Sequence, residues 1–112
     1  MKTIEGQIKI VPLSVNRAWR GRRFKTPEYK SFEKKLFFML PRVAVTKGMP
    51  LKISFLWGFS NMASDVDNPC KQTMDCMAKR FGFNDRDVME INLKKQKVKK
   101  GEEFIQFKIE DL

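Results

Sequence analysis

Five aspartates lie close together in the segment 63–88, although the 112-residue chain has a formal net charge of +10. They are Asp65, Asp67, Asp75, Asp85 and Asp87. Because alternate residues of an extended chain point to the same side, the carboxylates of Asp65 and Asp67 can face one point. Asp85 can join them only if the sheet brings its strand back alongside the loop that carries this pair. Three converging carboxylates repel one another unless a cation neutralises them, and their hard oxygen atoms favour Mg²⁺ or Mn²⁺.

Two interpretations of this acidic segment stay open. A divalent metal held by carboxylates can polarise a phosphodiester and activate a water molecule for hydrolysis. Alternatively, Asp65 and Asp67 only precede a helix N-terminus, where the helix dipole favours acids. Lys71 is equally open, because it lies four residues before Asp75, at the spacing of a surface ion pair. Beside a metal, the same lysine could hold the attacking water or stabilise the pentacovalent phosphate.

The residue types that the chain lacks exclude other chemistry. It has no histidine, which excludes a Ser-His-Asp triad, a Cys-His pair, a histidine general base and a histidine metal site. Its two cysteines, Cys70 and Cys76, fall short of a zinc finger. Six residues apart on one expected helix, they point to different sides and cannot form a disulfide with each other. Two free thiols are typical of a reducing compartment.

Two basic segments indicate contact with a polyanion. Residues 16–25, "NRAWRGRRFK", interleave cations with Trp19 and Phe24. The cations are Arg17, Arg20, Arg22, Arg23 and Lys25. Arginines bind phosphates through a forked guanidinium and aromatic rings stack on bases, so we interpret this segment as nucleic-acid-binding. The five lysines of residues 94–100, "KKQKVKK", either protect a strand edge from aggregation or extend the phosphate-binding surface.

The overall charge favours nucleic acid as the partner. A net charge of +10 on so small a chain points toward a polyanion. A membrane surface is less favoured, because no basic amphipathic helix has a strong apolar face. No apolar run approaches the roughly 18 residues of a membrane span, and the N-terminal "MKTIEGQIKI" does not have the pattern of a signal peptide. We therefore expect cytoplasmic residence and no membrane partner.

The elements that must position these residues follow from hydrophobic spacing. Residues 4–11 alternate as a half-buried strand that Pro12 ends, and residues 13–26 have no clean period and are expected to form a long basic loop. The sequence Thr26-Pro27-Glu28 has the signature of a helix start, and that helix should run to about Leu40. Residues 51–59 alternate as a second strand with five apolar residues on one face.

The second half of the chain predicts one helix and two strands. Asn68-Pro69 has the pattern of a helix cap followed by proline, and Gly82 should close that helix. Its buried stripe is expected to be Cys70, Met74, Met77, Ala78 and Phe81. Residues 88–98 and 103–109 are predicted to pair as a hairpin that turns through "KKGEE". The order β-α-β-α-β-β predicts an α+β fold, with two main helices on one face of a small mixed sheet of about four strands.

At this point the residues resemble a known family. "SDVDNPCKQTMD" followed by "GFNDRDV" is similar to the core motif of the RusA family of Holliday junction resolvases, also called crossover junction endodeoxyribonucleases. That motif is roughly D-x-D-N-x-x-K-x-x-x-D, followed by G-F and an acidic pair. The opening "PLSVNRAWRGRRFKTPEY" is similar to the opening of the same family. The resemblance implies one RusA-like endonuclease domain over residues 1–112, in a phage or bacterial protein.

The resemblance also implies roles for individual residues. Asp65 and Asp67 match the two aspartates before the helix, and with Asp85, the second member of the downstream pair, they would bind Mg²⁺ or Mn²⁺. Lys71 matches the essential lysine and Asn68 matches the asparagine of the motif. The first member of the downstream pair is Asn84 here, where an aspartate is common, and Asp87 is an alternative downstream acid. Asp75 matches a further helix aspartate.

The expected activity is metal-dependent hydrolysis of branched DNA. The resemblance implies a homodimer that cuts a four-way junction by two symmetric nicks, in recombination and repair, without a small-molecule cofactor. Two alternatives stay open. The chain could be a non-catalytic basic nucleic-acid-binding accessory protein whose aspartates do no chemistry, or a nuclease for other branched DNA such as flaps and forks.

Overall fold

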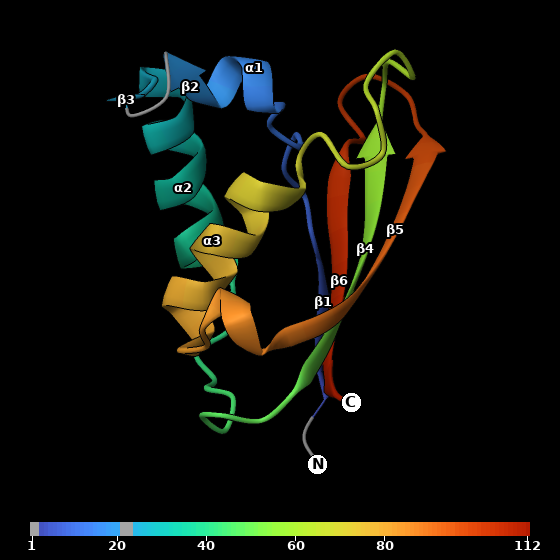
Figure 1. The fold of residues 1–112 in the computed structure, drawn as a ribbon. Coiled ribbons are helices and arrows are strands. Elements are labelled where there is room, and N and C mark those ends of the chain that lie inside the picture. The colour runs from blue at the N-terminus through green and yellow to red at the C-terminus, as the bar shows by residue number, and fades with distance from the viewer. Residues whose placement is uncertain (1–2, 21–23) are drawn as a thin grey trace.

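The fold is a four-stranded mixed sheet with its two long helices on one face (Figure 1), as the α+β prediction expects. The computed structural model describes residues 3–20 and 24–112. The sheet consists of β1 (Ile4–Ile8), β4 (Leu51–Phe59), β5 (Val88–Lys97) and β6 (Phe104–Asp111). The long helices are α2 (Pro27–Met39) and α3 (Cys70–Phe81). Shorter elements are α1 (Val15–Ala18), β2 (Trp19–Arg20), β3 (Phe24–Lys25) and the 3-10 turn η1 (Asp85–Asp87).

The strand order corrects the predicted hairpin. The sheet runs β1-β6-β4-β5, so β4 lies between the two strands that were expected to pair. Strand β5 runs parallel to β4 from Leu51 opposite Val88 to Phe59 opposite Lys97, while β6 runs antiparallel to β4 on its other side. The turn after β5 crosses the end of β4, where Val98 N donates to Phe59 O at 2.8 Å. β4 takes the central position because alternate residues along it are buried, whereas β5 is largely exposed.

The helix boundaries follow the predicted signals, with one exception. Thr26 caps α2, since its hydroxyl oxygen accepts a hydrogen bond from Tyr29 N at 3.1 Å. Gly82 closes α3 with a φ of 75°, a left-handed conformation that glycine adopts easily. The exception is Asn68, which does not cap α3, because the residue at that position is Pro69 and makes no side-chain cap.

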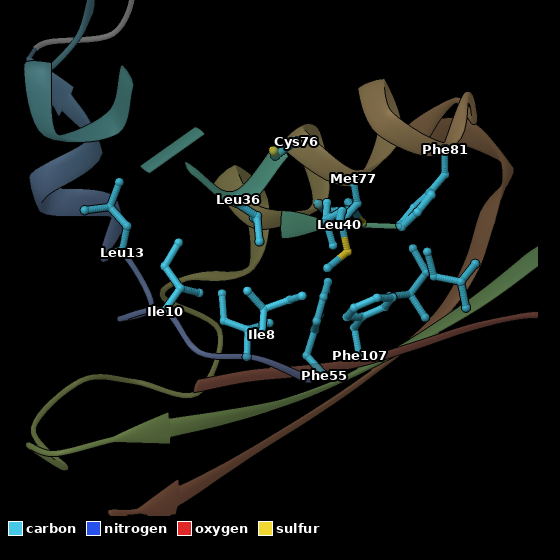
Figure 2. Packing of buried hydrophobic residues seen from close by; sticks show 14 of the residues in the cluster. Ile8, Ile10, Leu13, Leu36, Leu40, Phe55, Cys76, Met77, Phe81 and Phe107 are labelled. Atoms are coloured by element: carbon cyan, nitrogen blue, oxygen red, sulfur yellow. The ribbon is translucent and has the colours of Figure 1, made fainter. Parts of the chain in front are cut away.

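The core lies between the two helices and the inner face of the sheet. Figure 2 shows Leu36 of α2 and Met77 of α3 above Phe55 and Phe107 of the sheet. The five apolar residues predicted to share one face of β4 are all buried: Leu51, Ile53, Phe55, Trp57 and Phe59. None of the helices in the described residues has the length and apolar content that a membrane-spanning segment needs.

Gly58 lies on the face of β4 opposite to the five core residues, and its surroundings predict the effect of a substitution there. A Cβ atom at this position would lie 2.3 Å from the ring of Phe104, which covers the glycine. We therefore expect Gly58→Ala to lower the free energy of unfolding by about 1–3 kcal/mol, because the ring must move out of a packed position. Urea unfolding of both proteins measures the difference, with Ser54→Ala on the same face of β4 as control. Equal midpoints for Gly58→Ala and the wild type would contradict this expectation.

Candidate functional site

The two aspartates of the predicted acidic pair lie on the loop between β4 and α3, residues 60–69. Asp65 and Asp67 are both exposed. Their backbone carbonyls accept hydrogen bonds from Asn68 N and Cys70 N, each at 3.1 Å, so consecutive turns lead into α3. Neither carboxylate forms an ion pair or a side-chain hydrogen bond within the part of the chain that the structure describes. Their charges are therefore available to a ligand.

This loop is held in place by donors from two strands of the sheet. The indole N–H of Trp57, on β4, donates to Val66 O at 2.7 Å. The ammonium of Lys95, on β5, donates to Met62 O at 3.2 Å and to Ser64 O at 2.9 Å. Sequence reasoning missed both anchors, because Trp57 reads as a core residue and Lys95 as one of five similar lysines. The loop that carries Asp65 is thus fixed before any ligand arrives.

Lys95 should be the lysine of residues 94–100 on which this loop depends. Lys95→Met removes both donors to the loop, so amide hydrogen exchange of residues 62–66 should become faster by about tenfold. Lys94→Met is the matched control: Lys94 is the adjacent residue of β5, points to the opposite face and makes no such bond. Unchanged exchange in Lys95→Met, or equal acceleration in both variants, would show that the ammonium does not hold the loop.

Asn68 and Gln72 join the acidic loop to the N-terminal segment. Asn68 Oδ1 accepts a hydrogen bond from Val15 N, the first residue of α1, at 2.7 Å. The buried Gln72 donates from Nε2 to Leu13 O, and also to Asn68 O at 3.0 Å. The motif asparagine therefore has a positioning role that connects the acidic loop to the basic segment 53 residues earlier.

Lys71 lies between two aspartates at the start of α3. Its ammonium nitrogen is 3.0 Å from Asp75 Oδ1 and 3.0 Å from Asp85 Oδ2. These hydrogen bonds raise the pKa of Lys71 further above neutral pH than its usual value, so the ammonium stays protonated. The side chain is nevertheless 61% exposed, so it is accessible to a ligand. The i,i+4 pair with Asp75 follows the sequence spacing, whereas the contact with Asp85 depends on η1 packing against α3.

The two downstream acids differ in their surroundings. Asp85 reaches Lys71, whereas no ion pair joins Asp87 to Lys71 among the described residues. Asn84, where the RusA resemblance leads one to expect an aspartate, caps η1 by accepting a hydrogen bond from Arg86 N at 3.1 Å. Of the two candidates, Asp85 is the one that the structure places beside the motif lysine.

The predicted three-aspartate metal site is not assembled in this structure. Within residues 3–20 and 24–112, no three carboxylate or cysteine side chains form a group that could hold a metal ion. The strand register explains this, since β5 starts opposite Leu51, at the start of β4, while Asp65 follows the end of β4. Asp85 thus contacts Lys71, the lysine that also contacts Asp75, and forms no metal group with Asp65 and Asp67 among the described residues. The positions of the three aspartates do not fit the predicted ligand set, and the metal stays a prediction.

The basic segment forms a short helix and a ribbon where a loop was predicted. β2 pairs with β3 through Trp19 opposite Lys25, and the Trp19 ring packs edge-on against Tyr29 at 5.1 Å between centroids. Four-residue helices and two-residue strands are too short for a periodic pattern. The side chain of Arg20 is not described, and Arg22 and Arg23 lie outside the described residues.

The two described cations of this segment have different roles. Arg17 is exposed and forms no ion pair with another described residue. Lys25 instead contacts Glu33 at 2.9 Å and lies over the ring of Tyr29. Burial raises the pKa of Glu33, but hydrogen bonds from Lys25 and Lys79 outweigh it and lower the pKa overall. Lys25 thus fastens the ribbon to α2, and Arg17 is the cation available to a ligand.

Charged segments that are distant in sequence gather at one end of the molecule. Figure 1 shows α1, the loop that leads into α3 and the turn between β5 and β6 at the same end of the sheet. Lys97, Lys99 and Lys100 at this end are exposed. Exposed cations from two parts of the chain therefore lie around the loop that carries Asp65 and Asp67. Such an arrangement attracts a polyanion and presents carboxylates to it.

Comparisons with known protein families and with curated proteins find no relative of this chain. No model of a known protein family matches this chain, and a search of curated proteins finds no similar sequence.

Proposed function

We propose that this protein is a structure-selective DNA endonuclease that resolves Holliday junctions by phosphodiester hydrolysis in recombination and repair. The observation that supports it most is the exposed pair Asp65 and Asp67, whose carboxylates have no partner among the described residues and which lies on a loop held by Trp57 and Lys95. Carboxylates placed in this way can face a ligand. The cations at the same end would bring phosphates to them.

Lys71 supplies the positive charge nearest to this loop on α3. As a protonated, exposed ammonium it would stabilise the negative charge that develops on the phosphate. Asp75 and Asp85 would hold its side chain in position. Mg²⁺ or Mn²⁺, which the RusA resemblance implies, would supply a water of lowered pKa when bound. Because Asp65, Asp67 and Asp85 do not converge in this structure, no step is assigned to the metal.

A homodimer is part of the same proposal. Two copies would supply two sites for two symmetric nicks. The outer edge of β5 is the long edge of the sheet available for such pairing, since β4 occupies only its inner side. Light scattering on the purified protein tests this part, and a monomeric mass at working concentration would refute it.

The test of the proposed activity is cleavage of a synthetic four-way junction. Each strand is labelled in turn, and the protein is added with Mg²⁺, with Mn²⁺ or with a chelator. We expect paired nicks at symmetric positions with either metal and intact DNA with the chelator. Flap and fork substrates are cut in parallel, and faster cleavage of those would reassign the nuclease to other branched DNA.

One observation favours a second candidate, a non-catalytic nucleic-acid-binding accessory protein. The described acids do not assemble a metal group, and Lys71 is occupied by two carboxylates. This protein would bind the junction without nicking it under every metal condition. The cleavage assay therefore separates the two candidates directly.

A further inference from the structure

We propose that a groove beside the acid-bearing loop binds the sugar-phosphate backbone of a DNA strand, an inference that rests on the proposed function for its ligand class. The groove has a volume of about 980 Å³ and is lined by the segment 10–14, the first half of α2, the end of β4 and the turn after β5. Ser64, which directly precedes Asp65, and Pro69 form part of its wall. A strand lying in this groove would therefore reach the loop that carries the aspartates.

Three cations from separate elements line the groove: Arg17 of α1, Lys35 of α2 and Lys100 of the turn before β6. All three are exposed, and none forms an ion pair with another residue in the described part of the chain. Cations that share a groove repel one another unless an anion lies between them. Because they line the groove from three separate elements, they suit a ligand with several anions, as in a phosphate backbone.

The acids of the groove offset these cations only in part: the charge of Lys100 helps to lower the pKa of Glu103, but no ion pair joins the two among the described residues. Glu103 is buried and its carboxylate accepts a hydrogen bond from Gly101 N at 2.7 Å. Hydrogen bonds from its own backbone N–H and from Ser60 lower the pKa of Glu103, so its charge serves the turn. Glu28 is exposed at the N-terminus of α2, where the helix dipole favours it.

The neutral side chains of the groove also suit a nucleic-acid backbone. Hydroxyl groups of Ser14 and Ser31 and the amide of Asn61 also line it. Hydroxyl and amide groups are common donors to phosphate oxygens. The same groups would serve an acidic peptide less well, because its carboxylates lie on flexible side chains rather than along the backbone. We therefore assign a DNA strand as the occupant.

The decisive experiment compares two double variants with the same loss of charge. Lys35→Gln with Lys100→Gln removes two groove cations, whereas Lys34→Gln with Lys47→Gln removes two exposed lysines that do not line the groove. Affinity for a labelled four-way junction is measured with a chelator present, from about 50 to 200 mM salt. We expect the groove variant to reduce the slope of log K against log salt by about 1.4–1.8, the release of two counterions at 0.7–0.9 each. The control variant, which loses Lys34 and Lys47 instead, should bind as the wild type does.

Each outcome decides the proposal separately from the nuclease assignment. Equal losses in both double variants, or no loss in either, would overturn the groove, and so would displacement of the junction by polyglutamate at equal charge concentration. Binding with a chelator does not depend on cleavage. A protein that nicks junctions but binds them normally without the groove cations keeps the proposed function and refutes the groove. A protein that never nicks junctions, but whose binding weakens in the groove variant alone, refutes the proposed function and supports the groove.

Discussion

Asp67→Asn should abolish cleavage of a four-way junction while junction binding is kept or becomes tighter. Asp67 is exposed and makes no ion pair within the described residues, so the asparagine removes a charge without removing a contact of the fold. We expect single-turnover cleavage to fall below detection, since the proposed function makes the carboxylate of Asp67 part of the site that meets the phosphate. Binding should improve because a negative charge that faces a polyanion is gone. The melting temperature should stay unchanged.

The control for this variant is another exposed acid, on a different element. Glu5→Gln on β1 also removes one exposed carboxylate from a chain of net charge +10, and it lies on a strand away from the loop. It should leave both cleavage and binding at wild-type values. Wild-type cutting rates in Asp67→Asn would refute the proposed role of the acidic pair, whatever the metal content of the assay.

The fold could be predicted well wherever neighbouring residues determine it. β4 begins and ends at the predicted residues, because five alternating apolar side chains leave one way to bury a strand. The start of α2 was predictable from Thr26 and Pro27, and the end of α3 from Gly82. In each case the signal and the structure that it specifies lie within a few residues of each other.

Strand pairing and side-chain anchors could not be predicted in this way. The turn signal after β5 is correct, since Gly101 has a φ of 95° and Glu102 N donates to Lys99 O at 2.9 Å. A turn fixes only the reversal of the chain, however, and β4 takes the position beside β5 because its buried face must be central. The bond from Val15 to Asn68 likewise joins residues that share no local pattern.

In the candidate site, too, the sequence predicts which residues matter but not the contacts that depend on strand pairing. Asp65, Asp67 and Lys71 could be selected from residue type and spacing, and the structure places all three at the loop and the first turn of α3. The convergence of Asp85 with the acidic pair required a strand register that sequence does not contain. The observed register places Asp85 beside Lys71, which makes the lysine the residue that joins the two halves of the motif.

Lys71→Met should therefore reduce junction cleavage by on the order of 10²-fold with little loss of stability. Its ion pairs are exposed, so the free energy of unfolding should change by less than about 1 kcal/mol.

Lys79→Met is the matched control, because Lys79 lies on the same helix, is 58% exposed and also contacts a carboxylate, that of Glu33. Lys71→Arg should recover part of the activity, since it restores a cation that does not titrate near neutral pH. If Lys79→Met lost as much cleavage as Lys71→Met, the effect would belong to the charge of α3 as a whole. A role as a fixed cation, rather than a base, also predicts that Lys71→Arg follows the wild-type pH profile, because the raised pKa of Lys71 keeps it charged throughout the neutral range.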